Sequence, residues 1–238
     1  MRHWAGAALA CATYMGAVPA LAQSTGPSLS LEAASEERRR GLSWSAGDPV
    51  LRTALSVPLT SELSLDATAV TLRSSARHGG ADAVIDLQAG YTRRIGAWSL
   101  SAQATYHAFP GASGQGFAEI GAGAGFMIGP ASLDAFARYA PDQGSIGGDN
   151  LYLGASLAAG IPGTPLTLSG HVGHSSGSVD DPTAARRLRP GGSYWDHGVA
   201  LDYRKGRWFA GLRYANSSVG DSAAHAGPTA VAHVGIGF

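Results

Sequence analysis

The residues most able to perform chemistry in this sequence are a histidine and a serine two positions apart, His174 and Ser176. A histidine can accept the proton of a serine hydroxyl and turn that serine into a nucleophile. Residues i and i+2 of a β-strand point to the same side, so this spacing would bring both groups to one surface. No third residue is evident to orient the imidazole, so lipid-ester hydrolysis by His174 and Ser176 is an alternative hypothesis rather than the leading one.

Eight histidines raise the question of a metal site. His171 and His174 are three apart on a predicted strand, so they face opposite ways and cannot share one ion. The sole cysteine, Cys11, lies in the leader segment described below. We therefore predict no metal, no cofactor and no disulfide.

Charged side chains recur on one parity of many short apolar segments, and this is the most informative chemistry in the chain. On a barrel wall they would face the lumen, because an arginine facing the bilayer midplane costs ~2–4 kcal/mol. They would either set up a field that selects solutes or pair with one another and plug the lumen, and the sequence leaves both open. The candidates are Asp86, Glu119 and Asp134 on the acidic side and Arg52, Arg138 and Arg213 on the basic side.

The elements that position these charges are strands, because apolar and polar residues alternate with period two. The clearest is 229–238, where alternate residues are apolar and the last is Phe238. We expect about twelve strands, at 29–44, 50–59, 63–72, 82–91, 98–108, 117–128, 132–140, 150–161, 166–174, 194–204, 207–216 and 229–238.

The connections between these strands alternate between tight turns and longer loops. Short periplasmic turns, long outer loops and an even strand number are typical of bacterial outer-membrane barrels. After the leader, no stretch approaches the ~20 apolar residues that a spanning helix needs. The predicted fold is all-β, a transmembrane antiparallel up-and-down barrel, and the inward glycines should widen its lumen. A soluble secreted β-sandwich is the alternative fold.

Aromatic residues bracket the apolar face of several predicted strands. A spacing of eight residues at ~3.3 Å each, tilted by ~40°, spans roughly 20 Å, near the ~25 Å apolar band of a barrel. Trp and Tyr favour the membrane interface because each has an apolar body and a polar tip. The predicted girdle consists of Trp98 with Tyr106, Trp195 with Tyr203, and Trp208 with Tyr214.

The N-terminus reads as a secretory signal peptide over residues 1–22, with Ala20-Leu21-Ala22 as its small-x-small cleavage site. Residues 23–238 would then form the barrel in the outer membrane. The formal net charge is zero and charged residues are 14% of the chain, so nothing indicates a nucleic-acid partner.

The stretch Arg38-Arg39-Arg40-Gly41-Leu42-Ser43, together with Ala89-Gly90-Tyr91, residues 106–110 and the terminal Phe238, resembles the TorF-type putative porins of Gram-negative proteobacteria. Arg39 stands where that family tends to have an aromatic residue. The resemblance implies an outer-membrane barrel with a pore function and supplies no substrate. A terminal aromatic after alternating apolar residues also resembles the signal read by the barrel-assembly machinery.

We therefore expect a porin-like protein through which small hydrophilic solutes diffuse passively along a narrow polar lumen. Arg38 and Arg40 are expected at the rim, where Glu36 and Glu37 would neutralise them. The alternative is that they guide anions into the mouth or hold lipopolysaccharide phosphates. Besides the hydrolase, a structural or adhesive barrel acting through its outer loops, above all 175–193, remains open. In that loop Arg186, Arg187 and Arg189 are expected to contact lipopolysaccharide or solvent.

Overall fold

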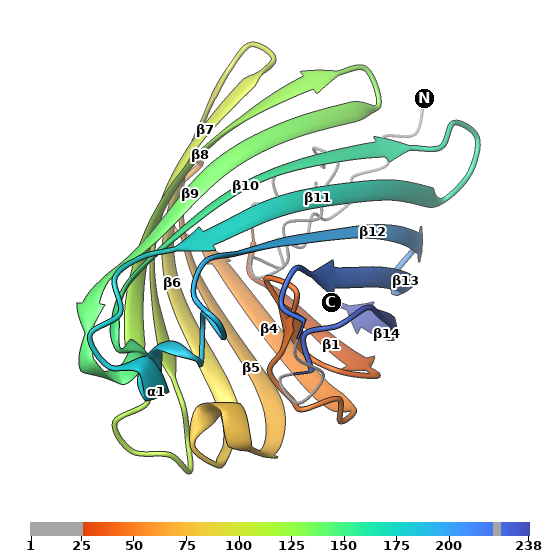
Figure 1. Cartoon of the computed structure of the whole chain (residues 1–238). Helices are drawn as coiled ribbons and strands as arrows, with labels where there is room; N and C mark the ends of the chain where they lie inside the picture. The colour runs from red at the N-terminus through yellow and green to blue at the C-terminus, as the bar shows by residue number, and fades with distance from the viewer. Residues whose placement is uncertain (1–25, 221–224) are drawn as a thin grey trace.

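Alternation of apolar and polar side chains builds one closed antiparallel sheet (Figure 1). The computed structural model describes residues 26–220 and 225–238, and within them twelve strands close the barrel. The barrel strands are β1 (Ser28–Ala34), β4 (Val50–Pro58), β5 (Leu63–Ser75), β6 (Ala81–Ile95), β7 (Trp98–Ala108), β8 (Phe117–Ile128), β9 (Ala131–Gln143), β10 (Gly148–Gly160), β11 (Leu166–Ser176), β12 (Tyr194–Lys205), β13 (Trp208–Ser217) and β14 (Thr229–Gly237). The fold class and the strand number predicted from the sequence are confirmed. The predicted signal peptide and Cys11 lie outside the described residues.

The predicted closing strand pairs with the first strand. In the register of β1 and β14, Ser30 lies opposite Gly237 and Ala34 opposite His233. The Phe238 amide donates to the carbonyl of Leu29 at 2.8 Å and so extends the seam to the last residue. Among the described residues, each of the twelve barrel strands is therefore paired on both edges, which is the condition for a sheet in hydrocarbon.

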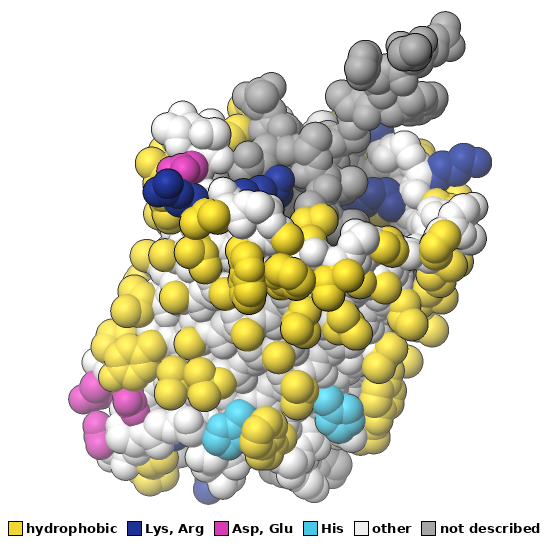
Figure 2. Space-filling model, turned by 90° about the horizontal axis from the view of Figure 1, so that it is seen from above, with side chains coloured by type: hydrophobic (Ala, Val, Ile, Leu, Met, Phe, Trp, Pro, Cys, Tyr) yellow, Lys and Arg dark blue, Asp and Glu magenta, His cyan; other side chains and the backbone are white. Residues whose placement is uncertain are grey.

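The outward face carries the apolar parity of each strand. Its large side chains are exposed, among them Leu51, Ile120 and Leu212. Figure 2 shows apolar side chains across the middle of the visible wall and charged ones toward its ends. All six predicted girdle residues are exposed on this surface. No helix in the described part of the chain has the length and apolar character needed to cross a membrane.

The long connections gather at one end of the barrel, which we call the outer end. They contain the 3-10 turns η1 (Ala76–His78) and η2 (Gly144–Ile146) and the short helix α1 (Pro182–Ala185). The tight turns lie at the opposite end, called the periplasmic end. This asymmetry is the one that the loop lengths predicted.

The predicted first strand, 29–44, is wrong beyond Ala34. The chain leaves the wall there, and residues 35–49 form an inserted segment with a small hairpin of β2 (Arg38–Arg39) and β3 (Leu42–Ser43). The turn uses positive φ at Arg40 (51°) and Gly41 (73°). A wall strand through five consecutive charged residues would have pointed alternate charges at lipid, so the segment turns inward to reach counter-charges instead.

Candidate functional site

The inserted segment is fastened inside the lumen by alternating charges. Glu37 accepts hydrogen bonds from Arg52 of β4 and from Arg39, whose Nε lies 2.7 Å from the Glu37 carboxylate. The Arg39 Nη2 atom lies 2.8 Å from Oδ2 of Asp86 on β6. These side chains are at most 6% exposed. One hairpin thus bridges two separate parts of the barrel wall.

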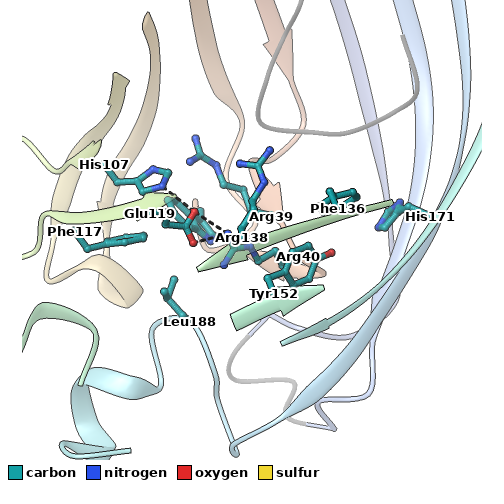
Figure 3. A pocket seen from close by; sticks show the side chains of 11 residues that line it. Arg39, Arg40, His107, Phe117, Glu119, Phe136, Arg138, Tyr152, His171 and Leu188 are labelled. Carbon is teal, nitrogen blue, oxygen red and sulfur yellow. Dashed lines mark hydrogen bonds and ion pairs between the residues drawn. The ribbon is translucent and has the colours of Figure 1, made fainter. Parts of the chain in front are cut away.

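His107 of β7 continues the chain of charges (Figure 3). Its Nδ1 lies 2.6 Å from Oδ1 of Asp86, and its Nε2 lies 3.2 Å from Oε2 of Glu119 on β8. Glu119 in turn accepts from Nη2 of Arg40 at 2.6 and 2.8 Å. A ring with protons on both nitrogens can donate to both carboxylates.

The predicted rim residues Arg38 and Arg40 lie inside the barrel, because the segment that carries them turns inward. Arg38 is 5% exposed and donates to Glu36 and to backbone carbonyls, including that of Gly41. The Arg40 guanidinium also lies over the Tyr152 ring, 4.7 Å from its centroid. Their predicted neutralisation by acidic neighbours holds for Arg38, whereas Arg40 is neutralised by Glu119 across the lumen.

Apolar packing closes the outer end above these charges. Trp44 of the inserted segment lies under the Arg39 guanidinium, 4.2 Å from ring centroid to Cζ, and beside His78 of η1 and Phe109. Leu188 of the loop after α1 joins the same buried cluster. Outer loops and inserted segment therefore share one core inside the barrel mouth.

Two arginines of the long 177–193 loop point into this closure and not toward lipopolysaccharide or solvent as expected. Arg187 donates to the carbonyl of Ser145 and to Nδ1 of His78, and Arg189 donates to the carbonyl of Gly177 at 2.8 Å. Burial lowers the pKa of Arg187 to about 10. Burial first, and then the positive charges of Arg187 and Arg77, hold the pKa of His78 well below its ordinary value of 6.5. Arg186 is exposed, as expected.

A cavity of about 70 Å³ lies beneath the inserted segment and opens among the inward side chains of β7 to β11. Figure 3 shows the side chains that surround it. They are Arg39, Arg40, Trp44, His107, Phe117, Glu119, Phe136, Arg138, Tyr152, His171 and Leu188.

The six predicted lumen charges lie at two levels of the barrel. The outer level is filled by the inserted segment and its buried network, and the lower level lies between that segment and the periplasmic end. Arg52, Asp86 and Glu119 belong to the buried network of the inserted segment, and Arg138 lines the cavity. Asp134 is partly exposed, and Arg213 lies 3.8 Å from Asp202, both of them about a third exposed. The plug and the open lumen, left as alternatives by the sequence, therefore each describe one level of the barrel. The predicted role in selectivity stays a prediction.

Three inward glycines do not leave the free space expected of them, whereas Gly160, on the same face of β10, does border open space. A methyl group at Gly154 would overlap the ring of Phe136, one at Gly173 the ring of Tyr152, and one at Gly235 the ring of Phe209. Each glycine lets an aromatic ring from the neighbouring strand lie against the wall. The period-two pattern showed which face the glycines share, but not what covers them.

The predicted catalytic pair is on the outward face near the outer end. The His174 ring packs on Trp195 with centroids 4.6 Å apart, and the Ser176 hydroxyl donates to the carbonyl of Leu151 at 3.5 Å. Each group thus has a different partner. In the described residues no group of three or more His, Cys, Asp or Glu side chains is arranged to hold a metal ion.

Comparison with solved structures gives outer-membrane porins and channels. The KdgM porin, solved in complex with disordered oligogalacturonate, has 11% identity and a TM-score of 0.60 over 89% of this chain and 98% of its own. The NanC porin has 10% identity and a TM-score of 0.61 over 88% and 98%. An outer membrane channel from Pseudomonas putida F1 has 14% identity and a TM-score of 0.55 over 94% and 98%.

These likenesses show the fold, which agrees with the predicted outer-membrane location. None of the curated proteins matches the chain. One bacterial protein family, described as of unknown function, has a model that matches residues 23–236.

Proposed function

The chain belongs to that family, Gcw_chp, and we propose that it is an outer-membrane porin through which small hydrophilic solutes diffuse passively. The polar inward face and the fold of known porins support this. Three more specific statements stay predictions. They are the relation to TorF-type porins, the absence of catalytic activity, and contacts with lipopolysaccharide and the barrel-assembly machinery.

The observation that carries the proposal is that the lumen is closed by a separable element. Residues 35–49 are held by ion pairs and packing, whereas β1 and β4 on either side pair directly, with Ala34 opposite Val50. The wall is therefore complete without the inserted segment. A closure that is not part of the wall can move while the barrel stays intact. We therefore describe a porin with a displaceable plug, and use that name for the inserted segment 35–49.

Planar-bilayer conductance of the purified, folded full chain tests this proposal. We expect small, mostly closed channels whose open fraction rises when the plug is loosened. Heat-modifiable mobility on a denaturing gel establishes that each preparation is folded. A folded barrel that conducts at no voltage, with the plug intact or loosened, contradicts the pore.

The other two hypotheses find less support in the geometry. The Ser176 hydroxyl is bonded to a backbone carbonyl, and the 177–193 loop turns Arg187 and Arg189 inward instead of presenting them to a partner. Phospholipid turnover that disappears in Ser176→Ala would favour the hydrolase. Loss of whole-cell adhesion on shortening this loop, without conductance, would favour the adhesive barrel.

A further inference from the structure

Among the charged side chains that line the cavity beneath the plug, cationic groups outnumber carboxylates. Among the described residues that line it are three arginines and two histidines, against the single carboxylate of Glu119. That carboxylate already accepts from Arg40 and lies 3.2 Å from His107. Three more carboxylates lie behind the lining: Asp86 and Glu37 balance Arg39, and Asp196 lies 3.3 Å from Nε2 of His171. The charged groups that reach the cavity itself are therefore mainly cationic donors, which suit an anion, and low-dielectric walls strengthen their effect.

The donors that face the cavity suit a flat, two-oxygen acceptor. Arg40 enters from the inserted segment and Arg138 from β9, and Figure 3 shows both beside Glu119. Guanidinium groups bind carboxylates through paired, charge-assisted hydrogen bonds. Glu119 is itself a carboxylate held by Arg40, so the cavity already displays the type of contact that a ligand carboxylate would repeat.

The rest of the lining is aromatic. Phe136 and Tyr152 lie 5.9 Å apart between ring centroids, each against a glycine of the next strand. Phe117 and Trp44 complete the apolar side. A cavity of about 70 Å³ has room for roughly five water-sized positions at ~10–15 Å³ each. This fits a carboxylate with a small apolar group, and is too small for an extended chain of sugars.

We propose that this cavity binds the carboxylate of a small organic anion, with Arg138 and Arg40 on its oxygens and Phe136 against its apolar part. The inference rests on the proposed pore function, because it names the class of solute that pauses in the lumen. Displacing Glu119 from Arg40 is the step by which such a solute would also loosen the plug.

Isothermal titration of the folded full chain in detergent tests the site with benzoate as the probe and benzamide as its uncharged counterpart. We expect benzoate to bind and benzamide to bind at least tenfold more weakly. Arg138→Gln should weaken benzoate binding about tenfold or more, and Arg138→Lys should restore part of it because the charge remains. Arg213→Gln, an inward arginine outside the cavity lining, is the matched control and should leave the affinity unchanged.

Equal affinity for benzamide and benzoate overturns the proposal, as does unchanged binding in folded Arg138→Gln. Inorganic phosphate that binds as tightly as benzoate also overturns it, since the site would then read charge alone. Conductance of the same preparations separates the two claims. If benzoate binds to a barrel that never conducts, the pore function is refuted and the binding site is supported. If the barrel conducts but does not bind benzoate, the binding site is refuted and the pore function is supported.

Discussion

The two levels of the lumen share the same wall but differ in how water reaches it. At the outer level the inward charges Asp86 and Glu119 are 3% exposed, because the inserted segment and the loops cover them. Below it, about a third of the side-chain surface of Asp202 and Arg213 is exposed to solvent. Strand alternation alone makes a polar tube, and the closure comes from a segment that does not belong to the wall. Inward charged side chains therefore hold the inserted segment in place at the outer level, whereas they face solvent at the lower level.

Removing the plug should have the largest effect, because it would expose the outer level of the lumen to water like the lower one. Replacing residues 36–48 by a short Gly-Ser turn is compatible with the wall, because Ala34 and Val50 already lie opposite each other. We expect a permanently open channel whose mean conductance is at least tenfold above that of the intact chain in planar bilayers. Replacing residues 111–114 of the loop between β7 and β8 in the same way is the control. Equal conductance in both would show that the segment does not close the pore.

Neutralising one wall carboxylate that holds the plug should have the next largest effect. In Glu119→Gln, Arg40 loses its buried counter-charge, and an uncompensated charge in such a site costs ~3–5 kcal/mol. The closed state should lose most of that, which raises the single-channel open fraction by two orders of magnitude or until it saturates. Asp134→Asn makes the matching change below the plug and should leave gating unaltered. Similar open fractions in the two variants would contradict the division of the lumen into two levels.

Acidification should loosen the outer level. His78 is fully buried beside Trp44 and Phe109, and it accepts a hydrogen bond from Arg187 through Nδ1. Its folded pKa is depressed, so the opened state binds a proton that the closed state does not. The stability of the closure is therefore complete above pH 6.5 and decreases as the pH falls below it. Hydrogen exchange of the outer-loop amides between pH 7.5 and 5.5 measures this, after correction for intrinsic exchange rates.

The His78→Asn variant should remove that dependence, whereas His174→Asn on the outward face should keep it. An identical pH response in both variants would assign the effect to other groups.

A small packing change should have the smallest effect. In Gly154→Ala the new methyl group overlaps the Phe136 ring, and overpacking of this kind typically costs ~1–3 kcal/mol. Gly160→Ala, on the same strand, meets open space and should cost little. The temperature at which the folded band disappears from a denaturing gel measures the difference. Matching temperatures would show that the ring has room to move.

The wall could be predicted from the sequence because its signal is local. Period-two alternation places every lumen charge on the inner face, and the terminal strand carries the pattern that closes the sheet. The inserted segment could not be placed because its position depends on Asp86 and Glu119, which lie far along the chain from Arg39 and Arg40. Its five consecutive charges were the available signal, since such a run cannot alternate with lipid-facing residues. The aromatic rings over the glycines depend on pairing register in the same way.

The order of the chain also constrains how the dry interior is assembled. The plug lies between the first two barrel strands, but its counter-charges arrive on β6 and β8. Until those strands join the sheet, Arg39 and Arg40 keep their hydration, because stripping water from an unpaired guanidinium is too costly. Desolvation of the segment is therefore a late event in biogenesis. The mouth is sealed only in the finished barrel, because a shorter fragment would lack the strands that carry the counter-charges.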